Sequence, residues 1–307
     1  QLRRFRPDIV HVHTPLPVGV AGVLTARMMR IPVVQTYHSY VPGFIQYAGL
    51  SRLLRLDRGP RRTRETWFAW LITRMLYDRS DLVLAPSRVL CDVLRRHRLK
   101  PRACDYTNGI DLAEFPPKTD WSLRRRVMHC GRLGFEKNTE VVVEAFALFS
   151  AHRPDWKLHL LGEGPAEPYL RHLIGSLGIL DRVQFEGFVD REYLAASYRA
   201  ADIYATASTI ETQGIGVLEA MASGTPVVGV DALAVPEMAE NGRDGIMVPP
   251  YDSAAMAAAF GRLADDDALR ERMGRACIAD VGAHELGAAI ERLERIYTDL
   301  LAVGQPD

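Results

Sequence analysis

Cysteine is scarce in this chain of 307 residues: four are present, at Cys91, Cys104, Cys130 and Cys277. Their wide separation excludes the closely spaced cysteine ligands of a structural zinc site and the dense pairing of a small disulfide-stapled domain. We expect no metal site and a reduced, cytoplasmic setting.

Long apolar runs are also missing. No stretch approaches the roughly 18 apolar residues that a membrane-spanning helix needs, and no secretory signal stands at the start. The sequence begins with Gln1 rather than Met and enters a predicted strand at Asp8. We therefore expect the natural N-terminus to lie upstream and the first domain to be truncated.

The net charge is zero, yet the charges are unevenly distributed. Residues 1–113 hold 19 Lys and Arg against 8 acids, and residues 52–79 hold eight Arg against three acids, interleaved with Trp67, Phe68, Trp70 and Tyr77. A basic, aromatic face suits anionic lipid head groups. The alternative is a solvated helix face. Nucleic acid is disfavoured as a partner because no nucleic-acid-binding motif accompanies the charge.

Strands and helices alternate along the chain, which predicts an α/β fold with parallel, doubly wound sheets. The composition, 48% hydrophobic, is sufficient for two cores. We expect domains at 1–113 and 122–282, a linker at 114–121 and a final helical segment at 283–307. Predicted strands are 8–12, 32–37, 82–85, 103–106, 126–130, 157–161, 183–186, 202–205, 227–230 and 245–248. Predicted helices include 18–29, 63–79, 87–96 (N-capped by Ser87), 139–151, 166–177, 192–200, 253–263, 268–281 and 286–302.

The most informative stretch is 207–226, which leaves one strand, passes a glycine-bearing turn and enters a short helix. Such a strand end is where open α/β sheets bind ligands. Amides of Gly214, Ile215 and Gly216 at the helix start suit a phosphate group. Glu219, expected in the first helical turn, suits the hydroxyls of a vicinal diol, and Glu211 suits a sugar hydroxyl or a developing positive charge. The alternative is that Glu219 complements the helix dipole and the glycines only make the turn.

Two cations lie in another strand-to-helix loop, Arg132 and Lys137. A guanidinium and an ammonium there suit a diphosphate, and the alternative is a pair of exposed loop charges. The glycines at 162 and 164 follow the next strand, and a turn that requires positive φ is the favoured explanation for them. Val189 follows a further strand, where main-chain groups suit a nucleobase edge.

His38 ends a strand of the first domain and is placed to hydrogen-bond a donor sugar, although a lone histidine is more often a satisfied polar residue. His11 and His13 share one side of their strand, and we assign them no role.

Together these motifs resemble glycosyltransferase family 4, the retaining sugar-nucleotide transferases. The resemblance spans nearly the whole chain. It is carried, in the family's order, by residues 7–14 (PDIVHVHT), 81–87 (DLVLAPS), 108–111 (NGID), 131–138 (GRLGFEKN), 162–165 (GEGP) and 207–226. The family's fold implies two Rossmann-like domains that face a cleft (GT-B). In the family, the first domain would bind the acceptor and the second domain would bind the nucleotide sugar. The last helix would pack back against the first domain. The family's usual opening strand and glycine-rich loop are absent here.

The resemblance implies roles for matching residues. Arg132 and Lys137 correspond to the cations on the donor diphosphate, and Glu219 to the glutamate on the ribose. Glu211 corresponds to the glutamate near the donor sugar, and His38 to the first-domain histidine that approaches that sugar. The phosphate-binding amides are those of Gly214, Ile215 and Gly216, and Val189 lies in the loop that meets the base. No metal or other cofactor is obligatory.

Within the family, residues 36–39 and 211–214 most resemble lipid hexosyltransferases such as monoglucosyldiacylglycerol synthases. This implies transfer of a hexose, with UDP-hexose favoured as donor, to a lipid hydroxyl at the inner face of the plasma membrane. One alternative is a GDP-mannose-dependent enzyme acting on a polysaccharide or phosphatidylinositol-type acceptor. Others are nucleotide-sugar epimerisation and a non-catalytic nucleotide-sugar-binding fragment.

Overall fold

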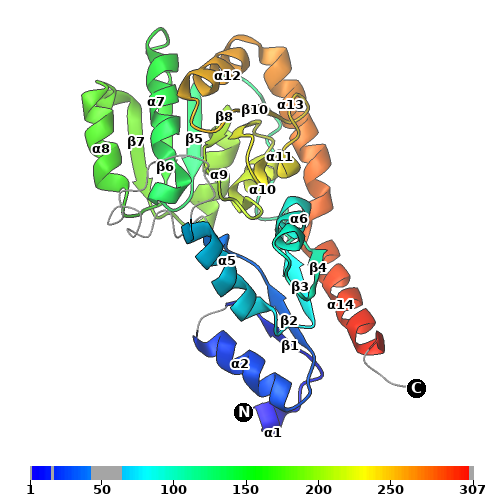
Figure 1. The fold of residues 1–307 in the computed structure, drawn as a ribbon. Coiled ribbons are helices and arrows are strands. Elements are labelled where there is room, and N and C mark those ends of the chain that lie inside the picture. The colour runs from blue at the N-terminus through cyan, green and yellow to red at the C-terminus, as the bar shows by residue number, and fades with distance from the viewer. Residues whose placement is uncertain (1, 15–16, 43–63, 304–307) are drawn as a thin grey trace. The chain divides into compact units, whose positions relative to one another are not determined.

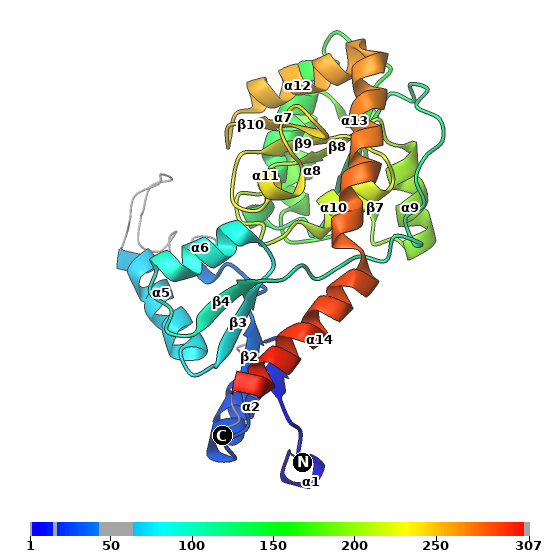
Figure 2. The same cartoon turned by 90° about the vertical axis from the view of Figure 1, so that its right-hand side faces the viewer.

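The computed structural model describes residues 2–14, 17–42 and 64–303. The chain divides into two compact units, one of Gln1–Gly109 with Gly287–Asp307 and one of Ile110–Leu286. Figures 1 and 2 show both as ribbons from two sides. In the described residues each unit has an all-parallel sheet covered by helices. The predicted α/β class with two parallel sheets is therefore confirmed.

The first unit contains, in its described part, a four-stranded sheet of order β1-β2-β3-β4. Side chains alternate between its faces because successive strand residues point in opposite directions. Val83 and Ala85 pack with α5 and α6, whereas Leu82 and Leu84 pack with Tyr297 of α14. The strands are β1 (Val10–Val12), β2 (Val33–Thr36), β3 (Leu82–Ala85) and β4 (Arg102–Asp105). The helices are α1 (Leu2–Phe5), α2 (Pro17–Met28), α5 (Arg64–Tyr77), α6 (Arg88–Arg96) and α14 (Leu286–Val303).

The second unit contains a six-stranded sheet of order β10-β9-β8-β5-β6-β7 in the part of the chain that is described. Its strands are β5 (Arg126–Cys130), β6 (Lys157–Leu161), β7 (Val183–Gly187), β8 (Ile203–Thr206), β9 (Val227–Val230) and β10 (Gly245–Val248). Its α-helices are α7 (Thr139–Ser150), α8 (Glu167–Ser176), α9 (Arg191–Ala200), α10 (Ile215–Ala222), α11 (Val235–Met238), α12 (Ser253–Asp265) and α13 (Asp267–Asp280). Short 3-10 turns are η1 (Phe135–Lys137), η2 (Leu180–Arg182) and η3 (Val281–His284).

The strand order of the second unit determines where a ligand can bind. The chain enters at β5, winds outward through β6 and β7, and returns to the other side of β5 through β8. The order reverses between β5 and β8, and doubly wound sheets bind ligands at the carboxyl ends of the strands at such a point. The loops after β5 and β8 hold the two cations and Glu211 of the sequence prediction.

Both faces of this sheet are covered by helices, and adjacent strand residues again divide between them. Val127 packs with α7, α8 and α12, whereas Met128 packs with α9 and α10. Both faces are apolar, as expected of a parallel sheet buried on both sides. The strands thus form a rigid support for the loops at their ends.

Three local expectations differ from the structure. Glu219 is the fifth residue of α10, not a first-turn residue, because the helix begins at Ile215, directly after the left-handed Gly214. Ser87 occupies the N-cap position of α6, but its buried hydroxyl makes no capping hydrogen bond. The eighth strand begins at Ile203 rather than at residue 202, although the Asp202 amide donates to the carbonyl of Arg126 at 2.9 Å and its carboxylate accepts from the amides of Arg124 and Arg126.

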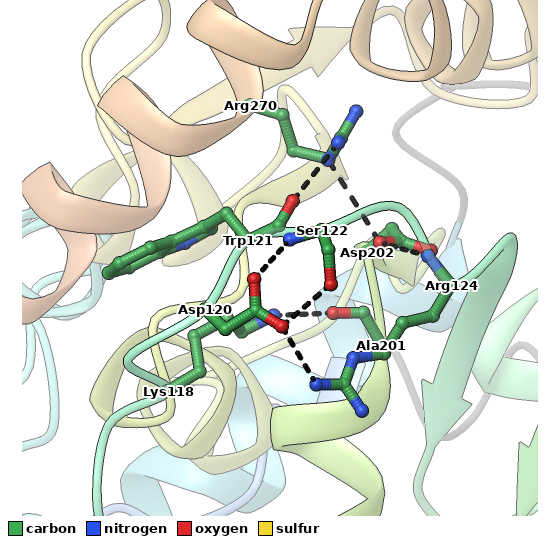
Figure 3. A pocket seen from close by; sticks show the side chains of 8 residues that line it. All are labelled: Lys118, Asp120, Trp121, Ser122, Arg124, Ala201, Asp202 and Arg270. Atoms are coloured by element: carbon green, nitrogen blue, oxygen red, sulfur yellow. Dashed lines mark hydrogen bonds and ion pairs between the residues drawn. The ribbon is translucent and has the colours of Figure 1, made fainter.

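A buried polar cluster within the second unit fastens the segment that enters β5 (Figure 3). Lys118 donates to the carbonyl of Ala201 at 2.5 Å, and the fully buried Arg270 donates to the carbonyl of Trp121 at 3.2 Å. Burial lowers the pKa of Lys118 to about 8. The space that these residues leave is too small for a water molecule, so the cluster is an anchor rather than a ligand site.

Candidate active site

The loops after β5 and β8 meet at the switch point of the second sheet. Lys137, which ends η1, donates to the Oε1 atom of Glu211 at 2.6 Å, and the two side chains are 25% and 18% exposed. Asn138 follows with a left-handed φ of 50°. Its side-chain amide donates to the carbonyl of Ala207 at 3.2 Å and to the hydroxyl of Thr209 at 3.4 Å. The sequence prediction missed Asn138, which joins the two loops.

A buried histidine on β5 contacts residues beside both of these loops. The Nδ1 atom of His129 on β5 lies 2.9 Å from the carbonyl of Ala205 on β8, and its Nε2 atom lies 3.3 Å from the hydroxyl of Thr139. Burial lowers the pKa of His129, so its ring is neutral at neutral pH. His129 therefore holds the two strands together without adding charge beneath the Lys137–Glu211 ion pair.

Arg132 leaves the same loop as Lys137 and pairs with Glu136. The Arg132 side chain is 55% exposed, whereas that of Glu136 is only 6% exposed. The guanidinium thus lies at the surface with one edge held by a buried carboxylate. Sequence reasoning treated Glu136 only as part of a motif and assigned it no role.

The start of α10 lies at the end of the loop that holds Glu211. Gly214 has φ 92° and ψ 62°, a left-handed conformation that disfavours other residues. Its carbonyl accepts from the amides of Val217 and Leu218, at 2.9 and 3.3 Å. The amides of Ile215 and Gly216 stand in the first turn, where a helix provides no internal acceptors. They are therefore suitable donors to an anion.

Glu219 is buried within the second turn of α10. Its Oε2 atom accepts from the hydroxyl of Tyr198 at 2.9 Å, and its Oε1 atom lies 3.6 Å from Nη1 of Arg191. Burial raises the pKa of Glu219, since the hydroxyl and the guanidinium only partly offset the loss of water. Tyr198 and Arg191 on α9 were not foreseen, because only the packing of α9 beside α10 brings them to this carboxylate.

The glycine turn after β6 serves the backbone. A Cβ atom at Gly162 would lie 2.1 Å from the carbonyl oxygen of Gly131, and Gly162 has φ +113°. The expectation of a turn that requires positive φ is confirmed for Gly162, whereas Gly164 has no positive φ and a Cβ atom there would lie 2.4 Å from the carbonyl oxygen of Leu133. Further along the sheet edge, Val189 is half-buried against the core, while its neighbour Phe188 is 87% exposed.

His38 lies in the first unit, just beyond β2. Its Nε2 atom is 3.0 Å from Nδ1 of His13, and the two rings stack with centroids 5.3 Å apart. Burial lowers the pKa of His38, and the neighbouring His13 lowers it further. His11 is held between Thr36 and Tyr297, at 2.7 and 2.5 Å. The two histidines that were left without a role therefore form the surroundings of His38.

The first unit also has a basic surface cavity of about 440 Å³. It is lined by Leu71, Arg74, Met75, Asp78, Arg79, Arg98 and Lys100. On α5, Trp67 and Met75 are 64% and 61% exposed. Part of the basic, aromatic stretch predicted at 52–79 thus forms a surface of cations and exposed apolar side chains. Residues 52–63 of that stretch lie outside the described residues.

Two kinds of feature are absent from the described residues. No helix within them is long and apolar enough to cross a bilayer. No group of three or more His, Cys, Asp or Glu side chains in the described ranges is arranged to hold a metal ion.

Family comparisons agree with this geometry. The model described as "Glycosyl transferases group 1" matches residues 114–279, and that described as "Glycosyltransferase Family 4" matches residues 1–114. The chain belongs to the group 1 glycosyl transferases. The resemblance to glycosyltransferase family 4 is thereby confirmed.

Individual relatives cover the chain to different extents. Alpha-monoglucosyldiacylglycerol synthase of Streptococcus pneumoniae is 31% identical over 74% of this chain and 52% of its own length. GDP-mannose-dependent alpha-mannosyltransferase of Mycolicibacterium smegmatis is 31% identical over 98% of this chain and 76% of its own. This chain spans about half the length of several such curated relatives, at 52%, 55% and 57%.

A solved structure supports the fold of this glycosyltransferase chain. Anabaena HepE, crystallised in complex with UDP, superposes with a TM-score of 0.79 and 20% identity, over 97% of this chain and 80% of that one. At that identity the likeness shows the fold alone, two Rossmann-like domains, as expected.

Proposed function

We propose that this chain is the core of a retaining glycosyltransferase that moves a hexose from a nucleoside-diphosphate sugar to a lipid hydroxyl. The observation that carries the proposal is the Lys137–Glu211 ion pair at the switch point, because it places a cation and a carboxylate where a diphosphate and its sugar would meet. The first unit would bind the acceptor and the second the donor.

The donor diphosphate would lie between the two cations and the start of α10. Arg132 and Lys137 supply charge from one loop, and the amides of Ile215 and Gly216 supply hydrogen bonds from the other, with Gly214 shaping the turn. These groups would stabilise the charge that develops on the leaving diphosphate. Because they already supply positive charge, we propose that no metal ion is obligatory.

Glu211 would contact the donor sugar. Its carboxylate pairs with Lys137 in the structure, and with a donor in place it would lie beside both the diphosphate and the hexose. No carboxylate is assigned as a nucleophile, so retention implies a dissociative, oxocarbenium-like transition state attacked from the face that the diphosphate leaves. A negative charge at Glu211 would stabilise that cation. His38 is proposed as a contact of the donor sugar on the family resemblance alone.

The nucleoside would lie at the other side of the diphosphate. Glu219 is held by Tyr198 and lies beside Arg191, so its carboxylate has a fixed direction. We assign it to the ribose hydroxyls. Val189, beside the exposed Phe188, would meet the base.

For the donor, UDP-hexose is favoured, supported by the fold shared with a UDP-bound protein. GDP-mannose is the alternative, supported by the mannosyltransferase relative. For the acceptor, a membrane lipid is supported by the resemblance to a diacylglycerol glycolipid synthase, and a polysaccharide or phosphatidylinositol-type acceptor is the alternative. A fragment that binds nucleotide sugar without catalysis is the competing non-enzymatic proposal.

The basic cavity of the first unit supports a lipid acceptor. Arg74, Arg98 and Lys100 line it, and exposed Trp67 and Met75 lie on the same helix as Arg74. Cations with exposed apolar side chains suit the interface of an anionic membrane. This supports our proposal that the protein lies in the cytoplasm, peripheral to the inner face of the plasma membrane.

The experiment that tests this function uses the full-length protein. Thermal unfolding is followed with UDP- and GDP-sugars, since a ligand that binds the folded state raises its apparent melting temperature. The stabilising donor is then incubated with lipid vesicles or a soluble glycan acceptor, and the product's anomeric configuration is read by NMR. Retained configuration on a lipid supports the proposal, and inverted product refutes it. Product formation without any acceptor indicates epimerisation, and binding without turnover indicates the non-catalytic alternative.

A further inference from the structure

One buried carboxylate at the proposed donor site has no role in the scheme above. Glu136 lies between Arg132 and Lys137 in the loop after β5, and its side chain is 6% exposed. A buried carboxylate is costly unless it is paired. Within the described residues, the Glu136 carboxylate accepts a hydrogen bond from the guanidinium of Arg132, four residues earlier.

The backbone reserves room for this carboxylate. A Cβ atom on Gly134 would lie 2.3 and 2.4 Å from the two carboxylate oxygens of Glu136. Gly134 has φ −98° and ψ 151°, an extended conformation open to most residues. A side chain at this position would therefore displace the Glu136 carboxylate, although the backbone conformation would accept one. Arg132, which pairs with the carboxylate, and Gly134, which leaves space for it, therefore both hold Glu136 in place.

Arg132 gains order from this arrangement. Its side chain is 55% exposed, and a free arginine loses much rotamer freedom when it binds an anion. A guanidinium already held along one edge loses less, so binding is tighter. Lys137 has the same relation to Glu211, which comes from the loop after β8. Each cation of the loop is thus held by a carboxylate.

We propose that Glu136 is a positioning residue that orients Arg132 toward the donor diphosphate, with Gly134 providing the space it occupies. The inference rests on the proposed function, because it takes the diphosphate to be the ligand of Arg132. Glu136 itself does not touch the donor. It acts through the direction and order of the guanidinium.

The test is calorimetry on the full-length protein with UDP and uridine, and with GDP and guanosine in parallel. A positioning role concerns the phosphates, so Glu136→Gln weakens diphosphate binding roughly tenfold and leaves nucleoside binding within about twofold. Gly134→Ala, which displaces the carboxylate without removing it, gives the same pattern. Glu136→Asp restores part of the affinity. Glu167→Gln is the matched control, because Glu167 pairs with Arg171 at the same four-residue spacing on α8.

The variants distinguish a failure of the proposed function from a failure of the positioning role of Glu136. If Arg132→Ala leaves diphosphate affinity unchanged, the assignment of Arg132 in the proposed function fails. If Arg132→Ala weakens binding while Glu136→Gln and Gly134→Ala bind as well as or better than the natural protein, only the positioning role fails. A parallel loss of nucleoside affinity contradicts it as well, since that loss indicates general damage. If Glu136→Gln does not fold, Gly134→Ala and Glu136→Asp decide the question.

Discussion

The Nζ atom of Lys137 lies 2.6 Å from the Oε1 atom of Glu211, although 74 residues separate them in the chain. Lys137 follows β5 and Glu211 follows β8, the two neighbouring strands between which the strand order reverses. The ion pair is thus a direct consequence of the doubly wound topology.

The ion pair is expected to couple the two loops energetically. Lys137→Met, Glu211→Gln and the double variant form a cycle in which the single changes are not additive, with an interaction of about 0.5–3 kcal/mol. Urea unfolding in the absence of donor measures it. Additivity within about 0.3 kcal/mol would show that the contact contributes nothing to the fold.

The ionised Glu219 carboxylate is expected to lower the stability of the fold at neutral pH, because it is buried. Its raised pKa means that the folded state holds the proton more tightly than the unfolded chain. Stability is therefore lost as pH rises from the unfolded pKa through the folded one. Glu219→Gln removes that loss and should raise the melting temperature at pH 7, which thermal unfolding measures.

The gain in stability from Glu219→Gln shrinks as the pH falls toward the pKa of an ordinary glutamate. The same substitution should also weaken nucleoside binding, because Glu219 is assigned to the ribose. Glu192→Gln, at an exposed position of α9, serves as control and changes neither quantity. A gain that is equal at pH 4 and pH 7 would refute the ionisation argument.

Gly216 is expected to be intolerant of a side chain. A Cβ atom there would lie 2.6 Å from the hydroxyl oxygen of Tyr204 and 3.3 Å from that of Tyr198. Gly216→Ala should therefore reduce the free energy of unfolding by about 1–3 kcal/mol, measured in urea. Gly282→Ala is the control, because nothing lies within 4 Å of a Cβ atom at that position. Equal effects of the two changes would contradict the packing argument.

The basic cavity of the first unit is expected to govern membrane attachment. Reversing charge with Arg98→Glu and Lys100→Glu should weaken binding to phosphatidylglycerol vesicles at least tenfold, since each basic residue near such a surface contributes about 1 kcal/mol. Sedimentation with vesicles measures this, and high salt should reproduce the loss. The charge-matched control is Arg262→Glu with Arg272→Glu, both exposed residues of the second unit. An equal loss in the control would assign the effect to net charge alone.

Much of the fold follows from local sequence patterns. The bounds of β5, β6, β9 and β10 were predicted to the residue, because each strand is a short apolar run between turn signals. Once the strands are known to be parallel, the strand ends must share one sheet edge. The positions of Arg132, Lys137 and Glu211 at that edge therefore follow from the sequence.

Contacts set by packing between helices were beyond the sequence. Tyr198 reaches Glu219 only because α9 lies beside α10. The burial of Glu136 depends on the space above Gly134, and nothing in the letters of the motif shows which of its charges points inward. The misplaced turn of Glu219 has a simpler cause, since the helix start depends on the left-handed conformation of Gly214.

The most direct test of the central claim is turnover of Lys137→Ala and Glu211→Ala in the full-length protein, with the donor identified by thermal unfolding. Both side chains are proposed to stabilise charge that develops in the transition state, so each change should lower kcat by roughly 10²–10³-fold. Lys157→Ala, which removes an exposed ammonium elsewhere on the same sheet, should leave kcat near that of the natural protein. If Lys137→Ala or Glu211→Ala retains turnover within a few-fold of the natural protein, the donor site is not at this switch point.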